Sequence, residues 1–357
     1  MPTLSPDRAA RTLTGVRRFC DSATVGTDLL AGLAQRVRPA VGWDCGVWFT
    51  TDPSTTLFTD AHVDGFDPDT CAPWFHHELN VEDVTLFRDR AGTGRVAVLA
   101  RDCDDPVRRS ARHREVMRPR GLEHEVRLTV GDASGTWGAI ELHRERGSRD
   151  FDTEELDLLA RLAPVVARGI RRQALERAAR DGADETGPGL LLVSPEGEVR
   201  PGTAAGAAWL ALLVPRDSQD THSALHTVAA LGTRDIGTAR LRTRAADGRW
   251  VTLHVAPAVD SDERVVIVEP TAPPEIADLL ARAHGLSARE REVALGLARG
   301  ESTETMAARL CVSPHTVRDH LKAVFRKTGT TSRTEVVSHL FTNWYAERVL
   351  GRHGSTG

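Results

Sequence analysis

The hydrophobic pattern of the chain is clearest near its C-terminal end, in a stretch that opens at Ser313-Pro314. Ser is a favoured N-cap because its hydroxyl accepts a hydrogen bond from a free backbone N–H, and Pro suits the first helical position, where no donor is needed. At about 100° per residue the next positions separate into two faces. The apolar face holds Val317, Leu321, Val324 and Phe325, and the opposite face holds His315, Arg318, Asp319, Lys322 and Arg326. The pattern predicts an amphipathic helix over residues 313–327 with a charged outer surface.

A second, shorter helix is predicted directly before it. Met306, Ala307 and Leu310 recur at helical spacing, and only Cys311 and Val312 separate this stretch from the Ser313 cap. Ser302 and Thr303 stand where the N-cap of the shorter helix is expected. Two short helices joined this tightly are typical of a helix-turn-helix, in which the second helix enters the major groove of DNA.

The surrounding residues also resemble a known family. They include a leading Ser-x-Arg-Glu, a Gly ten positions later, Ala307, Val312-Ser313-Pro314, Thr316-Val317, His320, Lys327 and Ser332-Arg333. Together they resemble the LuxR-type helix-turn-helix, an all-α four-helix DNA-binding domain, which we place at residues 283–345, before a tail at 346–357.

The resemblance implies roles for individual residues. His315, Arg318, Asp319 and Lys322 would face base edges and nearby phosphates, whereas Thr316, Arg326 and Lys327 would face the DNA backbone. Ser302 and Thr303 would cap the shorter helix and contact phosphate as a secondary role. Asp319 would repel phosphates unless it accepts from a cytosine amino group or pairs with Arg318 or Lys322, and we favour the pair within the helix. Glu290 and Arg333 match fixed family positions and are expected to form an ion pair.

Residues 1–178 follow a different pattern. An N-terminal helix is followed by strands on either side of Asp52-Pro53, a mixed segment, and a second hairpin around residues 131–135. Asp152-x-x-Glu155 predicts a capping box at the start of a long helix that Pro164 would kink. This order, with Phe151-Asp-x-Glu-Glu-Leu-x-Leu-Leu, resembles an α+β GAF sensor domain. The mixed segment is expected to contain surface helices at 72–79 and 106–117.

A further unit is predicted between this region and the DNA-binding domain. Gly and charged residues make 179–189 a linker by composition, and residues 190–270 then read as a tight hairpin, two helices and three strands. That order resembles a smaller α+β PAS-like domain, although one extended GAF domain is the alternative. Residues 271–282 form a connector that includes a short amphipathic helix. The expected fold class is therefore multidomain, with two α+β units and one all-α unit.

The charge distribution isolates the C-terminal stretch. The chain has a net charge of −4, yet nine Lys and Arg against six Asp and Glu give residues 286–341 a charge of +3, which leaves −7 on the remainder. The chain has two lysines, Lys322 and Lys327, and both lie on the predicted recognition helix. Five cysteines without a CxxC pair argue against a disulfide framework and favour the cytoplasm. No apolar run or signal pattern indicates a membrane.

Residues 1–270 contain few candidates for a metal, cofactor or ligand site. Cys71, His76, His77, Cys103 and His113 lack the spacing of a zinc site, so we expect no metal, and glycine-rich phosphate loops are absent, so we expect no cofactor. The aromatic residues Trp48, Phe49, Trp74, Phe75 and Trp137 are expected to be core rather than the lining of a pocket.

The sequence thus predicts a transcriptional regulator that is not an enzyme. Its expected partners are double-stranded DNA, a second copy of the chain as a homodimer, RNA polymerase, and an unknown small-molecule or protein signal sensed in residues 1–270. The dimer would use an a/d stripe at 156–170, a stripe that could equally pack on its own sheet, and the last helix. The alternatives are an interaction scaffold, or an enzyme-like N-terminal region that the DNA-binding unit localises.

Overall fold

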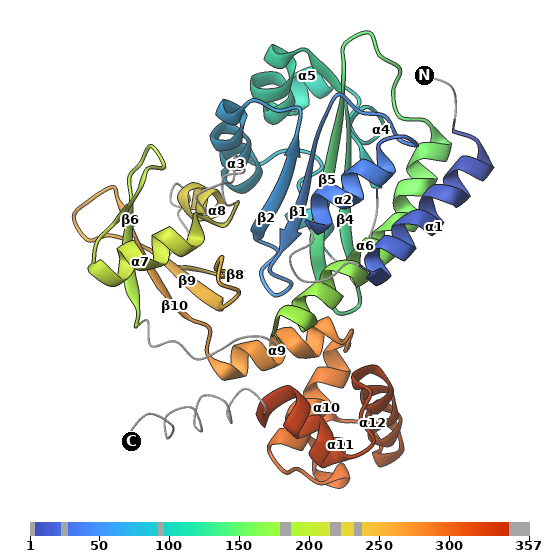
Figure 1. Cartoon of the computed structure of the whole chain (residues 1–357), viewed down its shortest axis with the longest axis vertical. Coiled ribbons are helices and arrows are strands. Elements are labelled where there is room, and N and C mark those ends of the chain that lie inside the picture. Colours follow the sequence, from blue (N-terminus) through green and yellow to red (C-terminus); the bar gives the residue numbers. More distant parts are fainter. Residues whose placement is uncertain are drawn as a thin grey trace.

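The computed structural model describes residues 4–22, 28–91, 96–178, 187–214, 223–231 and 238–342. They form two units, each built on an antiparallel sheet, which lie side by side, and a helical unit beyond them (Figure 1). The predicted tail and most of the predicted linker lie outside the described residues. No helix within the described ranges is both long and apolar enough to span a bilayer.

The N-terminal unit, residues 4–178, is built on a sheet with the strand order β2-β1-β5-β4-β3, in which all neighbours are antiparallel. The strands are β1 (Cys45–Thr51), β2 (Phe58–Asp64), β3 (Val96–Val98), β4 (Leu122–Asp132) and β5 (Gly135–Glu145). The hairpins β1–β2 and β4–β5 confirm the two predicted around Asp52-Pro53 and residues 131–135. Gly135 has a φ of +144°, and a Cβ there would lie 2.9 Å from the carbonyl oxygen of Pro53, so the two hairpin turns touch.

Helices cover both faces of this sheet. One face packs against α1 (Pro6–Ser22), α2 (Leu29–Val37) and α6 (Thr153–Ala178), and the other packs against α3 (Cys71–Asn80) and an irregular segment. The Asp152–Glu155 capping box is present, with both backbone N–H groups donating to the side chains. Shorter turns complete the irregular segment: η1 (Pro68–Thr70), η2 (Arg88–Arg90), α4 (Leu99–Asp102), α5 (Pro106–Arg109), η3 (His113–Met117) and η4 (Arg118–Arg120).

Two predictions for this unit are corrected. The predicted surface helix at 72–79 forms, but Trp74, Phe75 and Leu79 are buried, because the helix covers one face of the sheet. The predicted helix at 106–117 is broken at Ser110, which has an extended backbone and lies between α5 and η3.

The middle unit, residues 187–270, has the strand order β7-β6-β10-β9-β8. Its strands are β6 (Gly189–Val193), β7 (Val199–Pro201), β8 (Ala239–Arg244), β9 (Trp250–Pro257) and β10 (Arg264–Pro270), with α7 (Ala204–Leu213) and α8 (Ser223–Leu231) between β7 and β8. All of its neighbouring strands are antiparallel, so the two sheets share one topology. The predicted series of hairpin, two helices and three strands is confirmed, whereas its PAS-like identity stays a prediction.

The two sheet units are joined by a buried ion pair and by α8. Asp52 accepts hydrogen bonds from Arg242 Nε at 3.0 Å and Nη2 at 2.7 Å, and both side chains are at most 2% exposed. Burial opposes the charge of Asp52, but the hydrogen bonds and charge of Arg242 outweigh it and hold the pKa of this carboxyl below its usual value. Beside this pair, the ring of His226 on α8 stacks on Phe75 at 5.5 Å.

The helix α9 (Pro273–Ala283) leads from the middle unit into the helical unit, which consists of α10 (Ala288–Ala298), α11 (Thr303–Leu310), α12 (Pro314–Thr328), α13 (Arg333–Val337) and η5 (Ser338–Thr342). Leu279 and Ala283 belong to the core shared with α1, α2 and α6. Ile276, Leu280 and Ala281 belong to the core of the helical unit. The predicted amphipathic connector therefore buries apolar side chains in two cores.

Candidate nucleic-acid interface

The turn between α11 and α12 sets the direction of the second helix. Cys311 ends α11 with a left-handed φ of 54°, and the N–H of Val312 donates to the carbonyl of Ala307 at 3.0 Å. The hydroxyl of Ser313 then accepts from the N–H of Thr316 at 3.1 Å, and Pro314 is the first residue of α12. These contacts confirm the predicted cap and the two-residue separation.

The inner face of α12 packs as its periodicity predicts. Val317 and Val324 are fully buried and Leu321 is 5% exposed, in a core shared with α10 and α11, while Phe325 is half-buried at its edge. Leu297, Met306, Leu310, Val336 and Leu340 are also buried in this cluster. Because the apolar face of α12 is held in this core, the opposite, polar face of α12 is directed outward.

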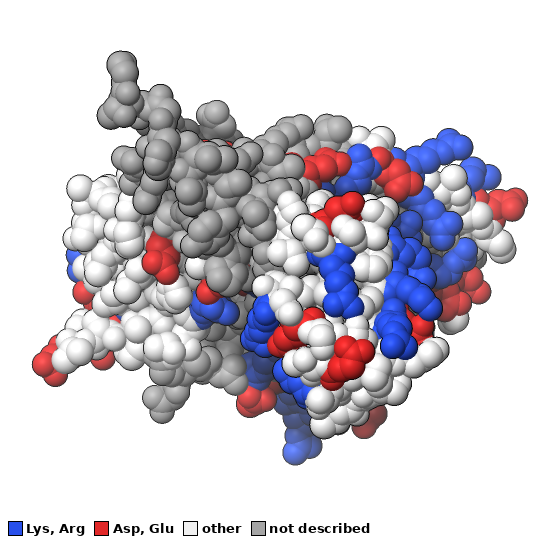
Figure 2. All heavy atoms as spheres, turned by 90° about the horizontal axis from the view of Figure 1, so that it is seen from below, with Lys and Arg blue, Asp and Glu red and all other residues white. Residues whose placement is uncertain are grey.

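The outer face of α12 is open to solvent. His315, Arg318, Asp319, Lys322 and Arg326 are all exposed. Asp319 lies 3.2 Å from both His315 Nδ1 and Lys322 Nζ, which confirms the predicted pairing within the helix and identifies Lys322 as the partner rather than Arg318. The hydrogen bond from Lys322 lowers the pKa of the Asp319 carboxyl. Seen from the side of the helical unit, Figure 2 shows a band of Lys and Arg side chains interrupted by Asp and Glu.

Lys327 has a different environment from Lys322. Its Nζ donates to Glu290 Oε2 at 2.6 Å and to the carbonyl of Gly285 at 3.0 Å, inside the unit. Glu290 also accepts from the N–H of Ser287 at 2.6 Å, as the second half of a capping box on α10. Because the last turn of α12 lies against the start of α10, the carboxylate and the ammonium meet there.

The predicted ion pair between Glu290 and Arg333 is therefore wrong. Arg333 is at the start of α13, close to the start of α11, and its Nη2 donates to the hydroxyl of Thr303 at 2.6 Å. Thr303 is buried by this contact. Ser302 caps α11 as predicted, accepting from the N–H of Thr305 at 3.1 Å. Thr316 is half-buried, with its hydroxyl 2.9 Å from that of Ser313.

A buried charged network in the N-terminal unit is the feature that the sequence did not reveal. Arg112 Nη2 donates to Glu125 Oε1 at 2.7 Å, and Arg127 Nη2 donates to Glu78 Oε2 at 2.6 Å and lies 3.0 Å from Glu141 Oε2, with every one of these side chains at most 1% exposed. Its members come from four separate segments, so no local motif marks them. Alternation of Glu125 with Arg127, and of Glu141 with His143, was the one available signal.

Among the described residues, three potential metal ligands converge at Glu125, Glu141 and His143. The guanidinium groups of Arg112 and Arg127 already pair with the carboxylates and oppose a further cation, so we interpret the network as structural. Arg127 and His143 outweigh the effect of burial and keep the pKa of Glu141 below its usual value. The candidates expected not to bind metal, Cys71, His76, His77, Cys103 and His113, are not part of this set.

The aromatic residues of the N-terminal unit are core, as predicted. Trp48 and Trp137 pack with α1, α2 and α6, whereas Phe49, Trp74 and Phe75 pack together on the other face of the sheet. The indole N–H of Trp74 donates to Glu141 at 3.0 Å, which connects this aromatic cluster to the charged network.

The geometry of α10–α13 defines the class: a capped second helix, fixed by a tight turn and carrying an exposed charged face, is a helix-turn-helix DNA-binding unit. Residues 284–340 match the profile of the family described as bacterial regulatory proteins, luxR family. These residues are thus a LuxR-type helix-turn-helix domain, as their sequence predicts.

Curated relatives match over the same part of the chain. The probable transcriptional regulatory protein NarL of Mycobacterium tuberculosis is 43% identical over 53 residues, which are 15% of this chain and 24% of the relative. The transcriptional regulatory protein UhpA of Escherichia coli is 38% identical over 73 residues, which are 20% of this chain and 37% of the relative. The chain thus matches 24% and 37% of the length of these two relatives.

Solved structures are less similar. SdiA in complex with octanoyl-rac-glycerol aligns over 94% of this chain and 96% of its own, with 12% identity and a TM-score of 0.38. The GAF domain of the cyanobacteriochrome TePixJ aligns over 43% of this chain and 94% of its own, with 14% identity and a TM-score of 0.33.

The contacts of Lys327 generate a stability prediction. We expect Lys327→Ala to weaken α10 and α12 by about 1–3 kcal/mol, because the nearly buried carboxylate of Glu290 loses its partner. Hydrogen exchange of the amides in these helices measures this local free energy in the full chain. Lys322→Ala, whose side chain is 76% exposed, is the control and should change the value by less than about 0.5 kcal/mol.

The same variant should lose its defect at low pH. Burial opposes the charge of Glu290, but Lys327 and Ser287 outweigh it, so the folded pKa lies below the ordinary 4.5. A lowered folded pKa contributes stability that is complete above 4.5 and is lost as the pH falls through the folded value. The difference between wild type and Lys327→Ala should therefore shrink below about pH 4. Equal protection of both proteins at neutral pH would contradict the internal role of Lys327.

Proposed function

We propose that the chain is a DNA-binding transcriptional regulator in which α12 enters the major groove and reads base edges. The observation that carries this proposal is the exposed face of α12, whose polar side chains are free to meet DNA while its inner face is fixed in the core. A major groove about 12 Å wide admits one α-helix. Its base edges offer the acceptors and donors that such side chains recognise.

The side chains at the start and middle of this face are assigned to bases. We assign His315, Arg318, Asp319 and Lys322 to base edges and the nearest phosphates, and Thr316, Arg326 and Ser302 to the backbone. Thr303 and Lys327 are bonded within the domain, which favours positioning of the helices over contact with DNA. We therefore propose that these two side chains position the helices, in place of the DNA contact that the family resemblance implies.

Asp319 is the side chain of this face that we expect to influence which DNA sequences are bound. Its carboxylate lies 3.2 Å from both His315 and Lys322, so these two side chains must leave it to reach acceptors on DNA. A carboxylate near phosphates reduces affinity for DNA in general, but it can accept from the amino group of cytosine. We propose that Asp319 lowers non-specific binding and favours sites with cytosine opposite the middle of α12.

Control from the N-terminal and middle units would pass through α9. Arg282 of α9 donates to the carbonyls of Pro53 and Ser134, both at 3.3 Å, so its C-terminal half touches both hairpin turns of the first sheet. Asp278, which accepts from Arg282 Nε at 2.8 Å on the same face of α9, lies 3.6 Å from Arg291 of α10. A small-molecule or protein signal that shifts either sheet unit would therefore shift α10 as well.

Binding as a homodimer is part of the proposal, because two copies of α12 would read two half-sites about 10 base pairs apart. The stripe at 156–170 does not supply the dimer surface: Leu159, Ala163, Val166 and Ile170 are buried against the chain's own sheet and α1. The last helix stays the proposed contact. RNA polymerase is a further proposed partner of the DNA-bound form.

A pure interaction scaffold is the second candidate, favoured by the α8 contact between the sheet units. It would bind a partner protein through these units and show no change in DNA affinity with a small molecule. An enzyme-like N-terminal region is not proposed, because the polar cluster we find there is an ion-paired network of buried groups.

The assignment of Lys322 can be tested on DNA. We expect Lys322→Ala to weaken binding to a selected duplex by about 1–3 kcal/mol and to relax its sequence preference if the ammonium reads a base. A phosphate contact would instead lower the salt slope by about one unit. Fluorescence anisotropy across a salt titration separates the two. Arg289→Ala removes an exposed charge on α10 and is the control; wild-type behaviour of Lys322→Ala at every salt concentration would refute the assignment.

The dimer can be tested on the same DNA. Sedimentation velocity of the full chain with a duplex containing both half-sites should give two chains per duplex at saturation, because each half-site takes one α12. A duplex with one half-site should bind more weakly and is the control. Saturation at one chain per two-site duplex would exclude the dimer.

A further inference from the structure

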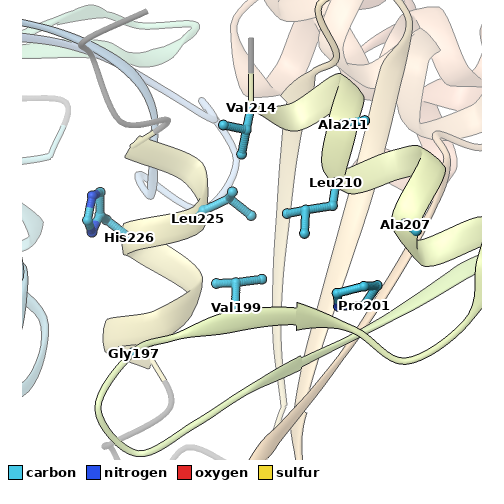
Figure 3. A pocket seen from close by; sticks show the side chains of 9 residues that line it. All are labelled: Gly197, Val199, Pro201, Ala207, Leu210, Ala211, Val214, Leu225 and His226. Carbon is cyan, nitrogen blue, oxygen red and sulfur yellow. The ribbon is translucent and has the colours of Figure 1, made fainter. Parts of the chain in front are cut away.

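A groove of about 510 Å³ lies on the middle unit, between the β6–β7 hairpin, α7 and α8. Figure 3 shows the side chains of Val199, Leu210, Val214 and Leu225 directed into this space from three different elements. His226 is at its edge, with the ring turned to the other side of α8, where it stacks on Phe75. The described residues that line the groove carry no charged side chain.

The helix α7 is apolar on its whole circumference. Its ten residues, Ala204–Leu213, include no charged side chain, and their one polar side-chain group, the indole N–H of Trp209, donates to the carbonyl of Gly187. Trp209 and Leu213 are fully buried against the sheet, whereas Ala207 and Ala211 face the groove and are exposed. Helices that are apolar all round are normally buried on all sides, because their apolar surface is then removed from water. Within the described part of the chain, the outer side of α7 is therefore left without the cover that an apolar helix normally has.

The size and chemistry of the groove specify the occupant. Nine of the described residues line it, whereas a stable protein interface takes about 20–30 residues on each side, so this lining is too small for a second protein chain. Its volume falls within the range of about 300–1,000 Å³ that is usual for small-molecule sites. A lining without charges favours an uncharged ligand, because a charged one would lose hydration without a partner.

We propose that this groove binds one small, uncharged, predominantly apolar molecule. The bound molecule would cover α7 and contact Leu225 of α8. The opposite side of α8 forms the contact with the N-terminal unit, where Thr227 donates to the carbonyl of Phe58 at 3.0 Å and Asn80 donates to that of Ala230 at 2.8 Å. Ligand binding would thereby act on the boundary between the sheet units, and any effect on DNA affinity rests on the function proposed above.

The test is a fluorescence titration of the full chain with Nile red, an uncharged apolar dye. Wild type should bind one equivalent saturably. Ala207→Trp and Ala211→Trp should each weaken binding by at least about tenfold, because an indole at these exposed positions fills the groove without entering the core. Ala208→Trp is the matched control, because Ala208 is exposed on the same helix but does not line the groove, and it should bind as wild type does.

Two results would overturn the proposal: non-saturable dye binding by wild type, or equal affinities for the Ala207→Trp, Ala211→Trp and Ala208→Trp variants. Thermal melts followed by circular dichroism establish that each variant is folded. The titration contains no DNA, so its outcome does not depend on DNA binding. A failure of the groove proposal can therefore be distinguished from a failure of the proposed function.

Discussion

The arrangement of the chain depends on the burial of one helix in two cores. Leu279 and Ala283 of α9 pack with the helices of the N-terminal unit, while Ile276, Leu280 and Ala281 pack with α10–α13. Burial of one leucine contributes about 1.5–3 kcal/mol, so exposing either set of α9 side chains to water would cost several kcal/mol. The start of α9 is held as well, because Arg242, already paired with Asp52, donates to the carbonyl of Glu275 at 2.8 Å. The helical unit is therefore fixed to both sheet units through α9, and Leu175 of α6 also packs against its core.

Because α9 fixes the helical unit to the sheet units, a change in either sheet unit would also move the proposed DNA-binding helix. The exposed face of α12 lies away from α9, and the described part of the chain leaves it open. A signal would then act on the position of the helical unit, and through it on the spacing of two copies of α12, rather than by uncovering the face. The groove lies on the middle unit, which the α8 contact and the Asp52–Arg242 pair join to the N-terminal unit, so it offers an entry point for such a signal.

Local features of the fold could be predicted from the sequence. The cap at Ser313, the apolar face of α12 and the Asp152–Glu155 box depend on residues a few positions apart, and all form as predicted. The charged network could not be predicted, because Glu78, Arg112 and Arg127 meet only after strand pairing has brought distant segments together. Lys327 was assigned by its place on the helix, and its partner Glu290 depends on how α12 packs over α10. The shared strand order of the two sheets was equally hidden, since no sequence repeat accompanies it.

The central claim is that α12 reads the major groove. It is tested most directly by measuring the affinity of the full chain for a selected duplex in which single purine N7 atoms, which are major-groove acceptors, are replaced by carbon. The account predicts a loss of about 1–3 kcal/mol at the one or two positions opposite α12 and none elsewhere. Unchanged affinity at every N7 position, with weaker binding when minor-groove acceptors are removed, would contradict it.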